Sequence, residues 1–347
     1  MDKVRFGKTE LMVSKVGMGC LPIQRLSIPD AVAVVRGAVD LGINFLDTAN
    51  GYTDSEEKIG AAIKDIPREN LVIASKSHAT DKKTLLEHLD LSLKRLGTDY
   101  LDLYQHHAVS TVEKYDAIMA EGGAYEGMLE AVSAGKLRFP GFTSHSVALA
   151  KKIMREQNFY SVQLPFNYVD VEAANEAIPL AQELDMGFIA MKPFGGGLLD
   201  DANLSMKYLM QFDSIVPDPG VMSMSEMEEI VRIYESGQPL SAAEMAAIEA
   251  KRAELGSVWC HRCDYCQPCQ QDIKISGVLT IDSLIKRAPY IGVMRIAGAN
   301  LENARNCIEC GDCVQRCPYN LDIPALIKEK LAIWDEYLAD NQPQPAS

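Results

Sequence analysis

Eight cysteines crowded into the last third of the chain constrain its fold more than any other sequence feature. They form two short runs, while Cys20 stands alone far upstream. Such runs arise as disulfide frameworks in secreted proteins or as metal-binding motifs inside cells. The N-terminal residues lack the apolar core of a signal peptide, and no stretch of about 18 apolar residues could span a membrane. We therefore predict a cytoplasmic protein whose clustered cysteines bind metal.

The spacing within the runs favours iron–sulfur clusters. The second run reads Cys-x2-Cys-x2-Cys-x3-Cys-Pro, which is the spacing of the bacterial ferredoxin ligand run. The first run is spaced x2, x2, x2, and Gln270 stands where the proline would follow. Structural zinc is the alternative, but zinc sites usually use two Cys-x2-Cys pairs well apart. Because the fourth cysteine of each ferredoxin run ligates the other cluster, we predict two [4Fe-4S] clusters, one held by Cys260, Cys263, Cys266 and Cys317 and the other by Cys307, Cys310, Cys313 and Cys269.

Composition limits the classes of partner. Of the 347 residues, 47% are hydrophobic, which is enough to bury a sizeable core. The formal net charge of −14 disfavours nucleic acid, whose phosphates attract basic proteins. An anionic membrane surface is disfavoured for the same reason. We expect a protein that binds neither nucleic acid nor membranes and whose acidity serves solubility.

Ahead of the cysteines, segments typical of buried strands alternate with segments typical of helices, after a short hairpin over residues 4–13. Repeated strand–helix units imply parallel strands, and eight of them in roughly 240 residues suit a closed (β/α)8 TIM barrel, whose usual length is about 250. A doubly wound open sheet is the competitor, but Gly17-Met18-Gly19-Cys20-Leu21-Pro22 lacks the third glycine of its nucleotide-binding turn. The expected strands are residues 16–19, 43–46, 71–75, 100–105, 141–143, 161–164, 187–191 and 214–216.

We therefore expect an α/β chain in which the barrel is followed by a small α-helical ferredoxin-like iron–sulfur domain. The predicted barrel covers residues 1–235, a connecting helix covers 236–256, and the iron–sulfur domain covers 257–338. Residues 339–347 are rich in Pro and Gln and are predicted to be a disordered tail. Within the barrel, Thr53-Asp54-Ser55-Glu56 has the pattern of a capping box that opens a helix.

Polar residues follow successive predicted strands. Asp47, Lys76 and His107 are 29 and 31 residues apart, about one β–α unit each. We therefore expect them at the C-terminal face of the barrel, where barrel enzymes hold their active sites. Tyr52 lies in the loop after Asp47, and His106 is expected to point away from His107 because side chains alternate along a strand. Other residues that follow strands are Cys20, His78 and His145.

The sequence around these residues resembles the aldo-keto reductase family. The segments that carry the resemblance are Asp47-Thr48-Ala49-Asn50-Gly51-Tyr52, Ser75-Lys76 and Asp102-Leu103-Tyr104-Gln105-His106-His107. The likeness covers roughly residues 5–200 well, and the whole chain resembles the branch of the family that carries a C-terminal ferredoxin-like module. It implies reduction of a small carbonyl compound or oxidation of the alcohol. The resemblance implies that Tyr52 is the general acid and that Lys76 lowers the pKa of Tyr52. It also implies that Asp47 anchors Lys76 and that His107 orients the carbonyl group.

The resemblance also implies a nicotinamide cofactor, for which this chain offers part of the family's contacts. Met191 stands where the family places an aromatic residue that stacks on the nicotinamide ring. Residues 220–229, where the family grips a 2′-phosphate with Lys and Arg, contain three carboxylates and no cation. Carboxylates oppose a phosphate, so NADH is favoured over NADPH. The residues expected to contact the cofactor are Thr143, Ser144, Gln163, Met191, Pro193 and Phe194.

Three functions fit these features. The first is a nicotinamide-linked oxidoreductase whose clusters are electron carriers or structural elements. Because a hydride carries two electrons and each cluster carries one, a flavin is a candidate mediator. The second is a reductase that takes single electrons from a ferredoxin-type donor without nicotinamide. In either case we expect an oxygen-sensitive enzyme of anaerobic metabolism. The third is an electron-transfer subunit of a larger redox complex.

Overall fold

The structure is a computed structural model of the chain, and it describes residues 1–156 and 159–341. The chain divides into two compact units, Met1–Ser241 and Ala242–Ser347. Most of the predicted tail lies outside the described residues, and the last helix extends to Asp340, past the predicted boundary at residue 338. Among the described residues, no helix is both long and apolar enough to cross a membrane.

Within its described residues, the first unit contains an eight-stranded parallel sheet that closes on itself. The strands lie side by side in chain order, and the first meets the last where Gly19 bridges Gly220 and donates its N–H to Pro219 O at 2.9 Å. This is the predicted barrel, and all eight predicted strands are present. They are β3 (Met18–Gly19), β4 (Phe45–Asp47), β5 (Val72–Ser77), β6 (Leu101–His106), β7 (Leu137–Thr143), β8 (Ser161–Pro165), β9 (Gly187–Met191) and β10 (Ile215–Pro217).

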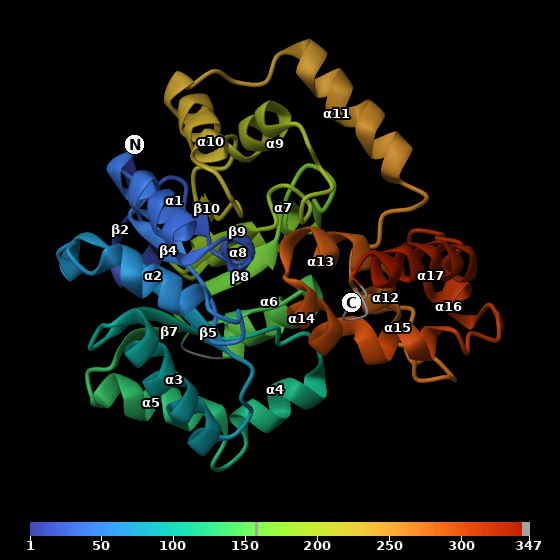
Figure 1. Ribbon diagram of the computed structural model, residues 1–347, viewed down its shortest axis with the longest axis horizontal. Helices are drawn as coiled ribbons and strands as arrows, with labels where there is room; N and C mark the ends of the chain where they lie inside the picture. Colours follow the sequence, from blue (N-terminus) through green and yellow to red (C-terminus); the bar gives the residue numbers. More distant parts are fainter. Residues whose placement is uncertain (157–158, 342–347) are drawn as a thin grey trace, which may run out of the picture. The chain divides into compact units, whose positions relative to one another are not determined.

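Helices alternate with these strands and surround them in Figure 1. Helix α1 (Ile28–Asp40) begins after Ser27, whose hydroxyl accepts the N–H of Asp30 at 3.3 Å. Helix α3 (Lys82–Leu96) ends at Gly97, whose φ of 65° is left-handed and therefore suits glycine. The other helices of this unit are α2 (Ser55–Ile63), α4 (Val112–Met119), α5 (Ala124–Ser133), α6 (Val147–Glu156), α7 (Glu172–Asn175), α8 (Ala177–Glu183), α9 (Ala202–Leu209) and α10 (Met224–Ser236).

The predicted capping box at the start of α2 is wrong. Asp54 precedes the helix, but its side chain accepts no capping hydrogen bond from the described residues. Thr53 donates its hydroxyl to Gln24 Oε1 at 2.8 Å, so it does not cap the helix. Glu56 turns inward and accepts from the Ser75 hydroxyl at 2.6 Å. Tertiary hydrogen bonds therefore replace the local ones that the sequence pattern predicts.

The N-terminal hairpin fills one end of the barrel. Its strands β1 (Lys3–Arg5) and β2 (Met12–Ser14) pair antiparallel. Phe6, Leu11 and Val13 are buried in one apolar cluster with residues of the barrel strands β4, β5, β6, β9 and β10. The rings of Phe6 and Phe45 lie 5.9 Å apart. Because apolar side chains occupy this end, a polar site can form only at the C-terminal ends of the strands.

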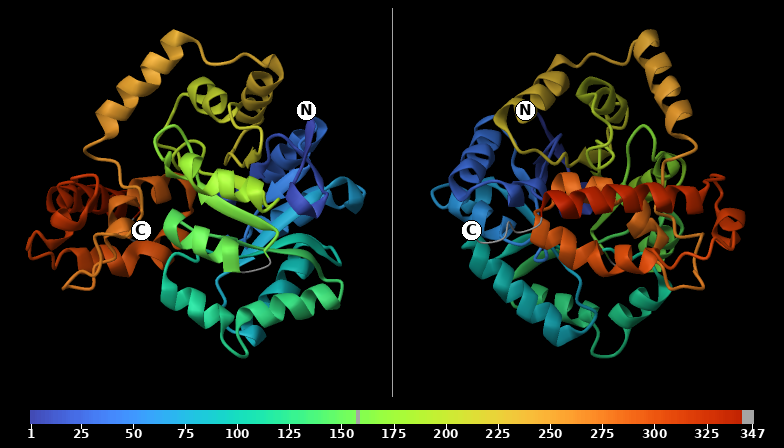
Figure 2. Two further views of the ribbon diagram at one scale, coloured as in Figure 1. Left: turned by 180° about the vertical axis from the view of Figure 1, so that it is seen from behind. Right: turned by 45° about the vertical axis from the view of Figure 1, so that its right-hand side comes forward.

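The described residues of the second unit, 242–341, are organised around helix α17 (Ile323–Asp340), which contacts α12 (Ile275–Leu279), α13 (Ile281–Arg287) and α15 (Ala299–Ala304) (Figure 2). Trp334 of α17 is fully buried in this core. The predicted α-helical character of this region is confirmed. Its other helices are α11 (Ala242–Leu255), α14 (Tyr290–Val293) and α16 (Asp312–Arg316), with a π-helical turn at Met294–Gly298.

Candidate active site and iron–sulfur centres

Lys76 lies at the centre of a buried polar cluster near the C-terminal ends of the barrel strands. Its ammonium donates to Asp47 Oδ2 and to Thr48 O, each at 2.6 Å. Lys76 and Asp47 are both buried. Burial alone would lower the pKa of Lys76, but the charges of Asp47 and Tyr52 outweigh it and leave the pKa raised. Lys76 is therefore a cation in the folded protein.

Tyr52 and His107 meet beside this ammonium. The centroid of the Tyr52 ring lies 5.6 Å from Lys76 Nζ and 5.7 Å from the His107 ring, which it meets edge-on. A tight turn after β4 holds Tyr52, whose N–H donates to Ala49 O at 2.9 Å. Burial of the His107 ring, followed by the nearby charge of His78, lowers the pKa of His107 well below its ordinary value. His107 is therefore a neutral ring beside the tyrosine.

His106 lies on the opposite side of strand β6 from His107. Its ring centroid is 6.5 Å from that of Tyr125 and 5.9 Å from that of Phe159. Burial lowers the pKa of His106 to about 3, so the ring is neutral. His106 therefore packs in an aromatic layer, and the structure brings together Asp47, Tyr52, Lys76 and His107 without it.

A second buried carboxyl, Asp218, joins the cluster, and sequence analysis missed it. Gln163 Nε2 donates to Asp218 Oδ2 at 2.8 Å and to Asp47 Oδ2 at 3.2 Å. Burial, followed by the charge of Asp47, raises the pKa of Asp218 well above its ordinary value. Asp218 therefore keeps its proton to a much higher pH than an exposed aspartate does. The signal that could have found Asp218 is its place two residues after the eighth predicted strand.

Replacing Asp218 by Asn is expected to stabilise the protein increasingly as the pH rises. A carboxyl whose pKa is raised by folding destabilises the native state above its ordinary pKa of about 4, up to the raised pKa, by about 1.4 kcal/mol for each unit of the shift. The Asn amide resembles the protonated carboxyl and removes this penalty. Thermal unfolding should therefore show a gain over wild type at pH 8 and little gain at pH 5.

The matched control for this experiment is Asp116→Asn, on an exposed position of α4. Its unfolding temperature should differ from that of wild type by the same small amount at both pH values. A loss of stability in Asp218→Asn that is equal at pH 5 and pH 8 would contradict the raised pKa.

Basic side chains surround His107 at the mouth of the barrel. The His78 ring stacks on the His107 ring with a centroid distance of 4.1 Å and an interplanar angle of 15°. Lys114 Nζ donates to His107 O at 2.6 Å and lies 3.4 Å from His78 Nδ1. Lys192 Nζ lies 2.7 Å from His145 Nε2. Sequence analysis singled out the histidines as strand-end residues but missed both lysines, because loop lysines are common in any sequence.

The residues expected to contact a nicotinamide lie in or shortly after the neighbouring strands β7, β8 and β9, and several of their polar groups already form hydrogen bonds. Thr143 Oγ1 accepts the N–H of Ala108 at 2.7 Å, and Ser144 Oγ accepts that of Ser146 at 3.0 Å. Gln163 Oε1 is buried and has no hydrogen-bond partner among the described residues. This orphaned acceptor fits an amide donor such as the carboxamide of nicotinamide. The remaining candidates end β9 or follow it: Met191, Pro193 and Phe194.

The acidic stretch after β10 stabilises a helix. Glu226 accepts the N–H groups of Met222 at 2.6 Å and Ser223 at 3.1 Å. The Ser223 hydroxyl accepts the N–H of Glu226 at 3.3 Å, which completes a capping box at the start of α10. Glu226, one of the three carboxylates on which the preference for NADH was based, therefore stabilises the start of α10.

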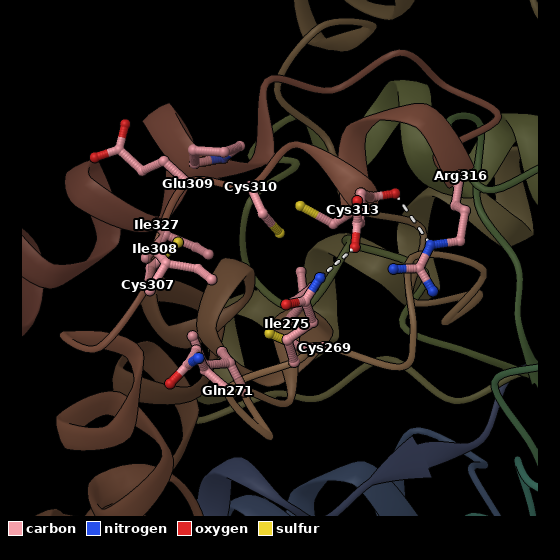
Figure 3. A pocket seen from close by; sticks show the side chains of 14 residues that line it. Cys269, Gln271, Ile275, Cys307, Ile308, Glu309, Cys310, Cys313, Arg316 and Ile327 are labelled. Atoms are coloured by element: carbon pink, nitrogen blue, oxygen red, sulfur yellow. Dashed lines mark hydrogen bonds between the residues drawn. The ribbon is translucent and has the colours of Figure 1, made fainter.

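Four cysteines line one cavity in the second unit (Figure 3). Cys269 of the first run joins Cys307, Cys310 and Cys313 of the second around one pocket. The sulfur atoms of Cys310 and Cys313 point into this space. This is the set predicted for one cluster, and a pocket lined by four cysteines fits an iron–sulfur cube. The isoleucines that line it are Ile273, Ile275, Ile308 and Ile327.

The other four predicted ligands also lie close together. Burial raises the pKa of Cys266 to about 12, and the neighbouring Cys260 and Cys263 add to the rise. Burial also raises the pKa of Cys263, and Cys317 adds to it. None of the nine cysteines, all of which lie within the described residues, forms a disulfide. In the same residues no three Cys, His, Asp or Glu side chains converge tightly enough to hold one metal ion, whereas a four-iron cube holds its thiolates farther apart.

Comparison with known proteins identifies both units. Residues 15–215, more than half of the chain, match the Aldo/keto reductase family. The chain belongs to the aldo/keto reductase family. In this aldo/keto reductase, residues 259–322 match the 4Fe-4S dicluster domain, and this range contains both cysteine runs.

Relatives and solved structures agree with this assignment. The oxidoreductase YqkF of Bacillus subtilis is 30% identical over 226 residues, which are 60% of this chain and 71% of the relative. Probable aldo-keto reductase 1 of Glycine max is 23% identical over 338 residues, 92% of each chain. The fold is similar to aldo-keto reductase AKR11C1 from Bacillus halodurans, holo form, with a TM-score of 0.62, 24% identity and coverage of 72% of this chain and 96% of that one. It is also similar to an aldo-keto reductase from Klebsiella pneumoniae in complex with NADPH, with a TM-score of 0.62, 22% identity and coverage of 72% and 95%.

Proposed function

We propose that this aldo/keto reductase reduces the carbonyl group of a small molecule, or oxidises the alcohol, in the barrel site and exchanges electrons through two [4Fe-4S] clusters. The observation that carries the proposal is that Tyr52 lies between the Lys76 ammonium, 5.6 Å from its ring, and the His107 ring, 5.7 Å away. This arrangement combines a proton donor, a cation that favours its phenolate and a neutral hydrogen-bond donor.

The chain's own residues handle the proton. A carbonyl gains a hydride equivalent at carbon and a proton at oxygen when it becomes an alcohol, and Tyr52 gives that proton. A phenol is a weak acid with an ordinary pKa of about 10, so the Lys76 ammonium matters because it stabilises the phenolate that remains. Neutral His107 donates its N–H to the carbonyl oxygen and orients it. Asp47 holds Lys76 in place, and Tyr52 regains its proton from solvent after the product leaves.

Two kinds of group would supply the electrons. A nicotinamide, held through Gln163 Oε1 and the neighbouring cofactor residues named above, supplies a hydride when bound. The two clusters, held by the two cysteine sets, supply electrons one at a time. NADH is favoured over NADPH because residues 220–229 contain no cation for a 2′-phosphate. A flavin would link one-electron to two-electron transfer.

A reductase without nicotinamide is the second candidate, and one observation favours it. The amide nitrogen of Gln163 is held by two carboxyls, Asp47 and Asp218, and Met191 offers no aromatic face for a nicotinamide ring. In this alternative a ferredoxin-type donor passes single electrons to the clusters, and Tyr52 and His107 still provide the proton and the hydrogen bond.

Anaerobically purified protein distinguishes these functions. We expect about eight iron and about eight sulfide ions per chain, as two [4Fe-4S] clusters require. The visible cluster absorbance is then recorded before and after NADH, NADPH or reduced ferredoxin is added. Bleaching by NADH supports the nicotinamide-linked enzyme, and bleaching by ferredoxin alone supports the second candidate. Reconstituted protein that holds no iron would contradict both.

A further inference from the structure

We propose that the mouth of the barrel binds an oxyanion through Lys114 and Lys192, and that this oxyanion is a carboxylate on the carbonyl substrate. The substrate class rests on the proposed function, whereas the anion site rests on the side chains alone. The phosphate of a bound nucleotide is the other source of an oxyanion at this place, and the experiment below separates the two.

The surroundings of Lys114 give the stronger support for the anion site. It lies in the first turn of α4 and is partly buried. Its ammonium contacts the His107 carbonyl at 2.6 Å and His78 Nδ1 at 3.4 Å, and neither of these atoms belongs to an anion. Burial lowers the pKa of Lys114. Among the described residues no acidic group offsets this effect, so folding removes the ammonium from water without a negative charge beside it. An anionic ligand would provide that charge.

Lys192 reaches the mouth from the loop after β9. Its Nζ lies 2.7 Å from the ring nitrogen Nε2 of His145. The backbone N–H of His145 donates to Ser110 Oγ at 2.9 Å. Lys192 adopts a left-handed φ of 59°, which costs energy for a residue with a side chain, and its carbonyl accepts the N–H of Gly195 at 2.8 Å. Strained backbone of this kind clusters at ligand sites because it aims a side chain.

Lys114 and Lys192 both belong to the surroundings of His107. The N–H of Val109 donates to Thr143 O at 2.7 Å, which joins the loop after β6 to the loop after β7. Burial is the main cause of the lowered pKa of His107, and the charges of Lys114 and His145 add to it, so these two side chains lie near its ring. Lys192 reaches the same region through its contact with His145. A carboxylate held by the lysines would therefore stand close to the groups that act on the carbonyl. A 2-oxo acid has this geometry.

The negative charge of the whole chain means that binding of an anion requires local positive charge, which Lys114 and Lys192 provide. With a formal net charge of −14, the protein repels organic acids at long range. A local group of cations at the mouth offsets that repulsion where the ligand binds. Hydrogen bonds from an ammonium to a carboxylate are also among the strong ones in proteins.

Calorimetric titration of the reconstituted protein with oxalate tests the site without turnover. Lys114→Met keeps the aliphatic stem and removes the charge, so it should weaken oxalate binding by about 10- to 100-fold, as loss of a charged hydrogen bond does. Lys192→Met should have an effect of the same sign. Lys114→Arg keeps the charge and should bind within a few-fold of wild type. Lys83→Met, on an exposed position of α3, is the control that should bind as wild type does.

A matched pair of ketones links the site to catalysis. Lys114→Met should lower kcat/KM for 2-oxobutanoate by a much larger factor than kcat/KM for 2,3-pentanedione, in which a neutral acetyl group replaces the carboxylate. Oxalate binding that is unchanged in both methionine variants would overturn the site. Weaker binding of nicotinamide mononucleotide with intact oxalate binding would overturn the substrate assignment in favour of a cofactor phosphate. Oxalate binding that depends on Lys114, in a protein that reduces neither ketone, supports the anion site and contradicts the proposed carbonyl reduction.

Discussion

Replacing Tyr52 by Phe is expected to lower kcat for carbonyl reduction by about 100- to 10,000-fold, the usual contribution of a positioned general acid. The ring that packs 5.7 Å from His107 is retained, and only the hydroxyl that carries the proton is lost. KM should change much less than kcat, because the phenol acts mainly when charge develops on the carbonyl oxygen. Anaerobic steady-state kinetics with a fixed electron donor would measure both constants.

Tyr125→Phe is the matched control for this variant. Tyr125 contacts His106 in the aromatic layer and does not belong to the cluster around Lys76. Its substitution should leave kcat within a few-fold of wild type. Both variants should hold the same amount of iron as wild type. A Tyr52→Phe protein with undiminished kcat would remove the general acid from the proposal and would favour an electron-transfer subunit.

Replacing Cys313 by Ser is expected to halve the iron content, from about eight to about four ions per chain. Cys313 lines the cavity with Cys269, Cys307 and Cys310, so its loss removes one thiolate of that set and leaves the other set complete. Serine is a poor substitute, because iron–sulfur clusters are held by soft thiolate ligands. Iron and sulfide analysis, with electron paramagnetic resonance of the reduced protein, would show one cluster signal in place of two.

The predicted exchange of the fourth cysteine between the two runs can be tested with further serine variants. Cys269→Ser and Cys307→Ser should remove the same cluster signal, although the two residues belong to different runs. Cys317→Ser should remove the other signal, because Cys317 neighbours Cys263. Cys20→Ser lies outside both sets and should keep about eight iron ions. If Cys269→Ser and Cys260→Ser removed the same signal, the exchange of the fourth ligand between the runs would be wrong.

Much of the barrel, and the meeting of Asp47, Tyr52, Lys76 and His107 at one end of it, could be predicted from the sequence because both depend on short-range order. Alternating strand and helix patterns place the end of each strand about one β–α unit from the next. Residues such as Asp47 and Lys76 therefore share one end of the barrel in any closed sheet of this kind. The cysteine spacing works in the same way, since three thiolates within one loop must lie close together whatever the rest of the chain does.

Other features depend on contacts between distant segments, which no local pattern encodes. The motif at Thr53–Glu56 predicts a capping box, but Gln24 and Ser75 provide better partners from elsewhere in the fold. The raised pKa of Asp218 exists only because barrel closure buries it beside Asp47, 171 positions earlier in the chain.

The sequence by itself therefore determined the barrel, the helical module, and the residue types available at the strand ends. Only the tertiary structure decided which of those side chains meet, because charge, burial and hydrogen bonding act over distances of a few ångströms in space. Lys114 illustrates the difference, since its ammonium becomes informative only when the fold places it 2.6 Å from the carbonyl of His107.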